Sequence, residues 1–219
     1  MSRRFHVVVA IPGIIQGEAR DREVLIEFPQ PLEPVTAVRS TLITSSLASL
    51  RTRGLFERYA KLQRSPHREA ILSSVAGAWL DLDVAAAHYQ ACDALGLSRD
   101  EQLDIGKDVS KRIHETFLRT ILSAARGVGL TPWVLLRRSD SVQTRLNRGG
   151  GVRLTRLTAR AARIEVAKHP LLELSYFRHG LLGIYLAAVD LMASNVSGQL
   201  VHAESQSPGE RTVLRLEWS

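Results

Sequence analysis

The sequence predicts an α+β fold in which a helical body packs on a four-stranded antiparallel sheet near the C-terminus. Three observations support this prediction. Helix capping signals and helical spacing of apolar residues extend over 38–147. After the glycine run at 149–151, the pattern changes to short β-rich segments separated by turn residues. One apolar helix, predicted over 178–193, stands between two pairs of these segments, so the order is strand, strand, helix, strand, strand.

The first 37 residues have the pattern of an extended arm or a small hairpin. Two β-rich runs, 5–15 and 24–28, are joined by a polar turn. Three prolines that disfavour helix follow the second run, at Pro29, Pro31 and Pro34. We therefore expect residues 1–37 to form an N-terminal arm and residues 38–219 to form one domain.

Capping chemistry marks three helix starts in the helical part, 38–147. Ser65-Pro66 and Thr131-Pro132 each place a hydroxyl at the N-cap and a proline at the first helical position. Ser98 and Glu101 have the spacing of a capping box, in which each side chain bonds the other residue's backbone N–H. We predict helix starts near 66, 99 and 132, with the last helix continuing to 146.

The sheet part, 148–219, contains four predicted strands around one helix. The strands are expected at 152–157, 162–168, 198–204 and 211–218. Helix 178–193 is apolar around nearly its whole circumference. Such a helix is buried on all sides, so we expect the sheet on one side of it and the other helices on the other.

Charge is distributed unevenly along the chain. The whole chain carries a formal net charge of +7, whereas the segment 111–168 alone holds thirteen Lys and Arg residues against three acids. A basic segment of this kind allows nucleic-acid binding as an alternative function. The aromatic content of 5% and the lack of a recognisable basic reading helix count against that alternative.

The single cysteine, Cys92, limits the class of protein. One cysteine can form neither an internal disulfide nor a Cys-rich zinc site, which fits a reducing compartment. The basic opening and the apolar run after it imitate a secretion signal, but Pro12 and Gly13 interrupt the run. No apolar run reaches the roughly 20 residues that a membrane span needs. We expect a cytoplasmic protein without a membrane span.

Six segments carry a resemblance to a known group of domains. They are 49–59 (SLRTRGLFERY), 87–96 (AHYQACDALG), 131–133 (TPW), 148–151 (RGGG), 170–180 (PLLELSYFRHG) and 216–218 (LEW). In these segments and in the order of its elements, the chain resembles a myxobacterial family similar to haem nitric-oxide-binding domains, four-vinyl-reductase domains and core subunits of the TRAPP complex. The resemblance implies the fold of nitric-oxide signalling and Golgi transport domains. It also implies a non-enzymatic sensor or adaptor that binds a small apolar or amphipathic ligand or a protein partner, and a homodimer.

The resemblance does not extend to the haem-binding residues. Haem nitric-oxide-binding domains hold iron with a histidine on the helix before the first strand of the sheet, and helix 131–146 of this chain has none. They hold the propionates with a Tyr-x-Ser-x-Arg motif. Leu174, Tyr176 and Arg178 stand at those positions, so only the arginine matches. We therefore predict no haem and no other cofactor.

Five residues around helix 178–193 are the candidate ligand contacts. They are Trp133, Tyr176, Arg178, Leu182 and Tyr185. Arg178 at a pocket mouth could hold a carboxylate or phosphate through paired hydrogen bonds. Alternatively, its guanidinium bonds backbone carbonyls or an internal acid, and the neighbouring aromatic residues only pack.

Other motifs favour structural roles. His88 and Cys92 have metal-ligand spacing on a helix, but two ligands do not make a site, so we predict no metal and expect a packed cysteine beside a hydrogen-bonded histidine. The segment Arg148 to Gly151 could cradle an anion, but a flexible helix-to-strand connection is the simpler interpretation. No hydrolase, metalloprotease or nucleotide-binding motif is present, which favours a non-enzymatic protein.

Overall fold

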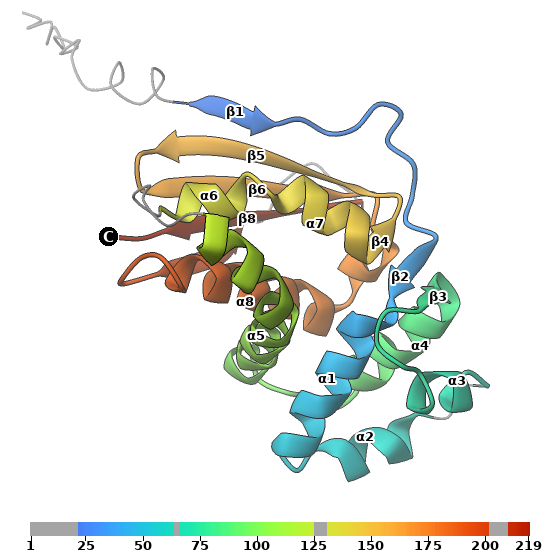
Figure 1. The fold of residues 1–219 in the computed structure, drawn as a ribbon. Coiled ribbons are helices and arrows are strands. Elements are labelled where there is room, and N and C mark those ends of the chain that lie inside the picture. The colour runs from blue at the N-terminus through green and yellow to red at the C-terminus, as the bar shows by residue number, and fades with distance from the viewer. Residues whose placement is uncertain (1–21, 64–65, 125–130, 202–209) are drawn as a thin grey trace, which may run out of the picture.

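The computed structural model describes residues 22–63, 66–124, 131–201 and 210–219. A helical body lies at one end of the molecule and a large antiparallel sheet at the other, with α5 and α8 between them (Figure 1). The helices are α1 (Ser40–Thr52), α2 (Phe56–Leu62), α3 (Arg68–Leu72), α4 (Leu82–Asp93), α5 (Arg99–Ala124), α6 (Pro132–Leu136), α7 (Ser139–Leu146) and α8 (Ser175–Asp190), and a short 3₁₀ turn covers Pro170–Glu173.

The larger sheet has five strands in the order β1-β5-β6-β8-β7, not the predicted four. Its strands are β1 (Glu23–Ile26), β5 (Gly151–Thr158), β6 (Ala161–Ala167), β7 (Ser197–Val201) and β8 (Arg211–Glu217). The fifth strand, β1, comes from the N-terminal arm and pairs antiparallel with β5. Two ion pairs accompany it, Arg156–Glu23 and Arg153–Glu27, each at 3.2 Å. The predicted run at 5–15 lies outside the described residues.

A smaller sheet, which the sequence did not predict, ties the helical part together. It consists of β2 (Ala37–Arg39), β3 (Trp79–Asp81) and β4 (Asn147–Arg148) in the order β3-β2-β4. Strands this short carry almost no periodic signal. Their pairing brings together three segments that are distant in the sequence.

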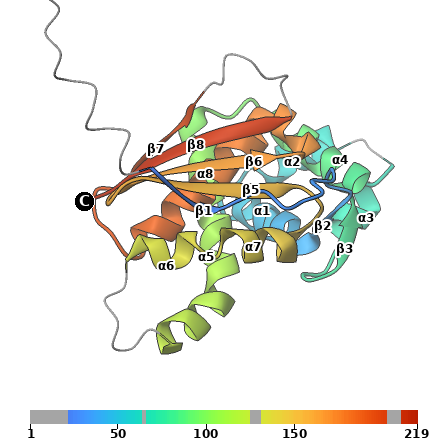
Figure 2. The ribbon, with the colours of Figure 1, turned by 90° about the horizontal axis from the view of Figure 1, so that it is seen from above.

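The two faces of the larger sheet differ in chemistry. Ile164 and Leu214, which are paired across β6 and β8, are fully buried on the face that covers α8. On the other face, Glu165 is paired with Arg163 at 3.2 Å and with Arg211 at 3.1 Å. Figure 2, seen from above, places α8 beneath the strands of this sheet. The core therefore lies between the sheet and α8.

The capping box predicted at Ser98 is confirmed. Ser98 Oγ accepts a hydrogen bond from the Glu101 backbone N–H at 3.3 Å, and Glu101 Oε2 accepts one from the Ser98 N–H at 2.8 Å. The helix expected near 66 begins at Arg68. The helix expected over 131–146 is wrong, because two short helices, α6 and α7, occupy this segment. The two helices pack on different partners, α6 on α8 and α7 on β5, so the chain turns between them.

Helix α8 begins earlier than predicted, at Ser175, and ends at Asp190. Asp93 at the end of α4 explains the early start, since its Oδ1 accepts a hydrogen bond from the Tyr176 backbone N–H at 2.7 Å. A carboxylate there satisfies a free N–H and interacts favourably with the helix dipole. The cap comes from another helix, so no local sequence signal marks it.

The glycine run at 149–151 is needed for a close crossing. Gly149 has φ +90°, and a Cβ there would lie 2.1 Å from the Pro34 carbonyl oxygen. The Gly150 backbone N–H donates to the Glu33 carbonyl at 2.7 Å. The run is therefore packed against the arm, and it is neither a flexible connection nor an anion cradle as the sequence suggested. No described helix is both long enough and apolar enough to cross a bilayer.

Candidate functional site

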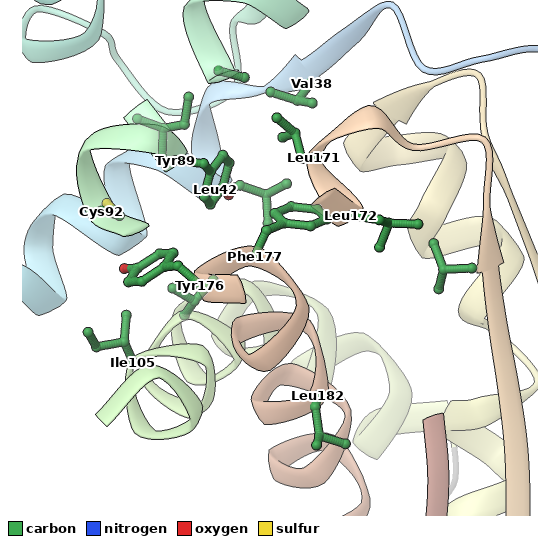
Figure 3. Packing of buried hydrophobic residues seen from close by; sticks show 14 of the residues in the cluster. Val38, Leu42, Tyr89, Cys92, Ile105, Leu171, Leu172, Tyr176, Phe177 and Leu182 are labelled. Carbon is green, nitrogen blue, oxygen red and sulfur yellow. The ribbon is translucent and has the colours of Figure 1, made fainter. Parts of the chain in front are cut away.

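A cavity of about 110 Å³ lies where α8 meets α1, α5 and α7. Side chains of Leu42, Tyr89, Ile105, Tyr176 and Phe177, from four different helices, come together in this region (Figure 3). Most of the wall is apolar, and the part of it that is described contains no Arg, Lys, Asp or Glu. An engineered cavity of about 150 Å³ in another protein binds benzene, so this space suits one small ring or a short chain.

A glycine crossing between α5 and α8 positions the cavity. A Cβ on Gly106 of α5 would lie 2.1 Å from the Gly180 carbonyl oxygen, and one on Gly183 would lie 2.1 Å from the Leu103 carbonyl oxygen. The two backbones therefore touch. A Cβ on Gly180 would meet nothing within 4 Å, because Gly180 borders the cavity.

Helix α8 is buried on only part of its circumference. Leu182 and Val189 are fully buried, as the apolar pattern predicted. Leu181, Ile184 and Tyr185, which line the cavity, are only half-buried, and so are Leu186 and Ala187, which do not line it. The expectation that the whole circumference is buried is therefore corrected.

A buried polar network closes one end of the cavity. Tyr176 Oη and Ser46 Oγ, both from the wall, are 3.0 Å apart. Ser46 Oγ is also 3.1 Å from His88 Nε2, and His88 Nδ1 is 2.9 Å from Tyr59 Oη. Burial lowers the pKa of His88 to about 3 and raises the pKa of the Tyr176 phenol. Both groups are uncharged near neutral pH.

His88 and Cys92 share a helix face as expected, with Sγ 3.6 Å from Nε2. Both side chains are fully buried, and the imidazole is bonded to Tyr59 and Ser46. In the described ranges, no group of three or more His, Cys, Asp or Glu side chains could hold a metal ion. The pair belongs to the core.

A second polar group, at the His169 corner (Gln143, Asn147 and His169), also borders the cavity. His169 Nε2 is 3.2 Å from Asn147 Oδ1, and Asn147 Nδ2 donates to Gln143 Oε1 at 3.0 Å. Gln143 Nε2 and His169 Nδ1 are buried and have no hydrogen-bond partner in the part of the chain that the structure describes. Burial lowers the pKa of His169 to about 3, so the imidazole is neutral.

The structure brings two of the five candidate contacts to this cavity. Tyr176 and Tyr185 lie in its wall. Leu182 points toward the sheet, where its Cδ1 would lie 3.1 Å from a Cβ on Gly198. Trp133 packs on Trp218 with ring centroids 5.1 Å apart, and its Nε1 donates to the Ala159 carbonyl at 2.9 Å.

Arg178 lies outside the cavity wall. Its Nη1 donates to the carbonyl oxygens of Leu172, at 2.6 Å, and Glu173, at 2.8 Å. Of the two roles considered for Arg178 from the sequence, these contacts match the second, in which the guanidinium hydrogen-bonds backbone carbonyls. It fixes the turn that leads into α8.

Sequence reasoning missed the polar residues Ser46, Gln143, Asn147 and His169. Ser46 and Tyr176 are 130 positions apart in the sequence, so only the tertiary fold pairs them. No local motif could have assigned these residues to one cavity.

The basic segment 111–168 is partly neutralised within the fold. Arg153, Arg156, Arg163 and Lys168 each have an acidic partner within 4 Å. Arg148 stacks on the Trp79 ring at 4.6 Å. This arrangement gives the nucleic-acid alternative no support.

Solved structures to which this chain is similar include H-NOX domains. The Fe(II) unliganded H-NOX protein from K. algicida is 13% identical and aligns over 83% of this chain and 96% of its own, with a TM-score of 0.61. A variant H-NOX domain of T. tengcongensis is 12% identical over 82% of this chain and 96% of its own, with a TM-score of 0.56. The chain has an H-NOX-like fold.

The H-NOX-like fold confirms the predicted likeness in fold to haem nitric-oxide-binding domains, and no comparison shows the myxobacterial family. The comparisons give no support to the four-vinyl-reductase and TRAPP resemblances. Comparison of the sequence with protein-family models and with curated proteins gives no match. At 12–14% identity, the likeness concerns the fold.

H-NOX domains imply a haem, but the residues of this cavity do not fit one. The volume of about 110 Å³ is well below the roughly 300 Å³ at which ligand pockets of drug-sized molecules begin. Its described wall offers no cation for the propionates, and the Arg178 guanidinium is already bonded to backbone carbonyls. One imidazole nitrogen, His169 Nδ1, has no hydrogen-bond partner among the described residues. A single nitrogen that could bind iron does not make the cavity large enough for a porphyrin ring.

Proposed function

We propose that this chain is a non-enzymatic sensor or adaptor module that binds a small, mainly apolar molecule in the cavity beside α8. The observation that carries this proposal is the composition of the wall. It takes residues from α1 and α5 of the helical body, and also from α7, β6 and α8. An occupant therefore contacts both parts of the molecule.

The contacts near the cavity suggest how occupancy is transmitted. Tyr176 of α8 bonds Ser46 of α1 through its hydroxyl, and Asp93 of α4 through its backbone N–H. A ligand that binds better to one arrangement of α8 against α1 and α4 shifts the molecule toward that arrangement. Such a shift would alter the geometry of these two hydrogen bonds.

The wall is poorly suited to catalysis. The described wall residues include no carboxylate, lysine or cysteine. His169 is a weak base because burial lowers its pKa to about 3, and burial raises the pKa of Tyr185 to about 12. Groups with these pKa values are poor general acids and bases at neutral pH.

Toluene is a suitable first probe, because it is a single small ring without a polar group. At 100 times its Kd, it should stabilise the folded protein by about 2.7 kcal/mol, measured as a rise in the thermal midpoint. Ile184→Phe should abolish the effect by filling the space. Leu191→Phe, at an exposed position next to the same helix, should leave it unchanged. Equal responses of the two variants, or no stabilisation at all, would contradict the proposal.

The proposal includes a protein partner that reads the occupied state, either a second copy of this chain or another protein. Light scattering with and without toluene tests the first case. A mass that stays at the monomer value of 24.2 kDa in both conditions would exclude the homodimer.

A further inference from the structure

The His169 corner leaves two buried polar atoms without partners. Its hydrogen bonds run from His169 through Asn147 to Gln143, and they end at His169 Nδ1 on one side and Gln143 Nε2 on the other. Buried polar atoms are nearly always hydrogen-bonded, so two free atoms on residues that line one cavity indicate a missing partner.

The donor and acceptor count at this corner does not depend on how the side-chain amides are oriented. With His169 Nε2–H donating to Asn147, and Asn147 donating to Gln143, the free atoms are an acceptor nitrogen on His169 and an N–H donor on Gln143. With both amides turned over and the other imidazole tautomer, the free atoms are an N–H on His169 and a carbonyl oxygen on Gln143. Either way, one donor and one acceptor remain.

We infer that the cavity takes a small uncharged molecule bearing one hydroxyl or amide group, which is held at the corner of Gln143, Asn147 and His169. This inference rests on the proposed function and names the ligand class for it. A hydroxyl or an amide supplies one donor and one acceptor. A carboxylate only accepts, and the described wall offers it no cation, so its burial is unfavourable.

The apolar remainder of the wall sets the shape of the ligand. Leu42, Ile105, Val109 and Val142 surround the space into which the rest of the molecule extends. A volume of about 110 Å³ limits the occupant to one small ring or a short chain. A phenol such as p-cresol therefore matches both the corner and the volume.

Calorimetric titration with three probes that share a tolyl ring tests the inference: p-cresol, toluene and p-toluate. We expect p-cresol to bind about fivefold or more tightly than toluene, and p-toluate to bind more weakly than p-cresol. Gln143→Leu should remove the preference for p-cresol over toluene. Gln199→Leu replaces an exposed glutamine on β7 and should change neither the affinity for p-cresol nor the affinity for toluene. In wild-type protein, p-cresol but not toluene should shift the ¹⁵N resonances of His169.

The outcomes separate this inference from the proposed function. Equal binding of p-cresol and toluene overturns the inference and leaves the proposed function standing. Tighter binding of p-toluate also overturns it, in favour of an anionic ligand. Binding of none of the three probes overturns the proposed function itself. A p-cresol preference that survives Gln143→Leu, with no ¹⁵N shift at His169, places the hydroxyl elsewhere and overturns the assigned corner.

Discussion

At the scale of single residues, burial decides what a side chain can do. Cys92 and His88 have the spacing of a metal pair, but both are fully buried, and burial lowers the pKa of His88 while it raises that of the Cys92 thiol. A protonated thiol is neither a nucleophile nor a metal ligand. The same two residues on an exposed helix would behave quite differently.

Because Cys92 is the only cysteine, its reactivity can be measured directly. The folded protein should not react with dithiodipyridine over minutes at pH 7.5, whereas denaturant should release one thiol per chain. Gln199→Cys places a second thiol at an exposed position and should react at once. Rapid reaction of Cys92 in the folded wild-type protein would contradict its burial.

At the scale of elements, the crossing of α5 and α8 depends on two glycines that allow backbone contact. Gly106 and Gly183 face carbonyl oxygens of the opposite helix, whereas Gly180 faces open space. Helical glycine is unfavourable by itself, so the close approach must compensate for it. The crossing also determines where the cavity opens.

Three alanine substitutions at this crossing should change the free energy of unfolding in opposite directions. Gly106→Ala and Gly183→Ala should each lower the free energy of unfolding by about 2 kcal/mol or more, because backbone must move. Gly180→Ala should raise it by about 0.5–1 kcal/mol, since alanine favours helix and meets nothing. Urea unfolding measures all three. A destabilising Gly180→Ala together with a neutral Gly106→Ala would show that the crossing is arranged differently.

At the scale of the whole molecule, the two buried histidines make stability depend on pH. Burial lowers the pKa of His88 and of His169 to about 3, and both groups recover ordinary values near 6.5 on unfolding. Above pH 6.5 both imidazoles are mostly unprotonated in the folded and in the unfolded protein. As pH falls from 6.5 toward 3, the unfolded state binds them and the folded state does not, so stability is lost.

Between pH 7 and pH 5 the free energy of unfolding should fall by roughly 2 kcal/mol per histidine, or about 4 kcal/mol for the pair. This is a large part of the 5–15 kcal/mol typical of a domain. Carboxyl groups titrate at lower pH, so the histidines dominate this interval. Urea midpoints at the two pH values measure the loss. A flat profile would mean that both imidazoles reach solvent in the folded state.

The sequence by itself determined the order of the four C-terminal strands and the apolar helix, and several element boundaries. The start of α5 follows from the Ser98 capping box, and that of α6 from Pro132, because capping is local chemistry within a few residues. The four C-terminal strands and the apolar helix follow from periodicity, which is also local. Of the candidate contacts, Tyr176 and Tyr185 lie in the cavity wall because the apolar helix carries them there.

Only the tertiary structure decided the fifth strand, the early start of α8 and the site itself. β1 finds its partner on β5 more than a hundred residues later, and Asp93 caps α8 from another helix. The cavity borders the glycine contact between α5 and α8, and its polar corner exists because Gln143, Asn147 and His169 meet there. These contacts join residues that are distant in the chain, where neither periodicity nor capping leaves a signal.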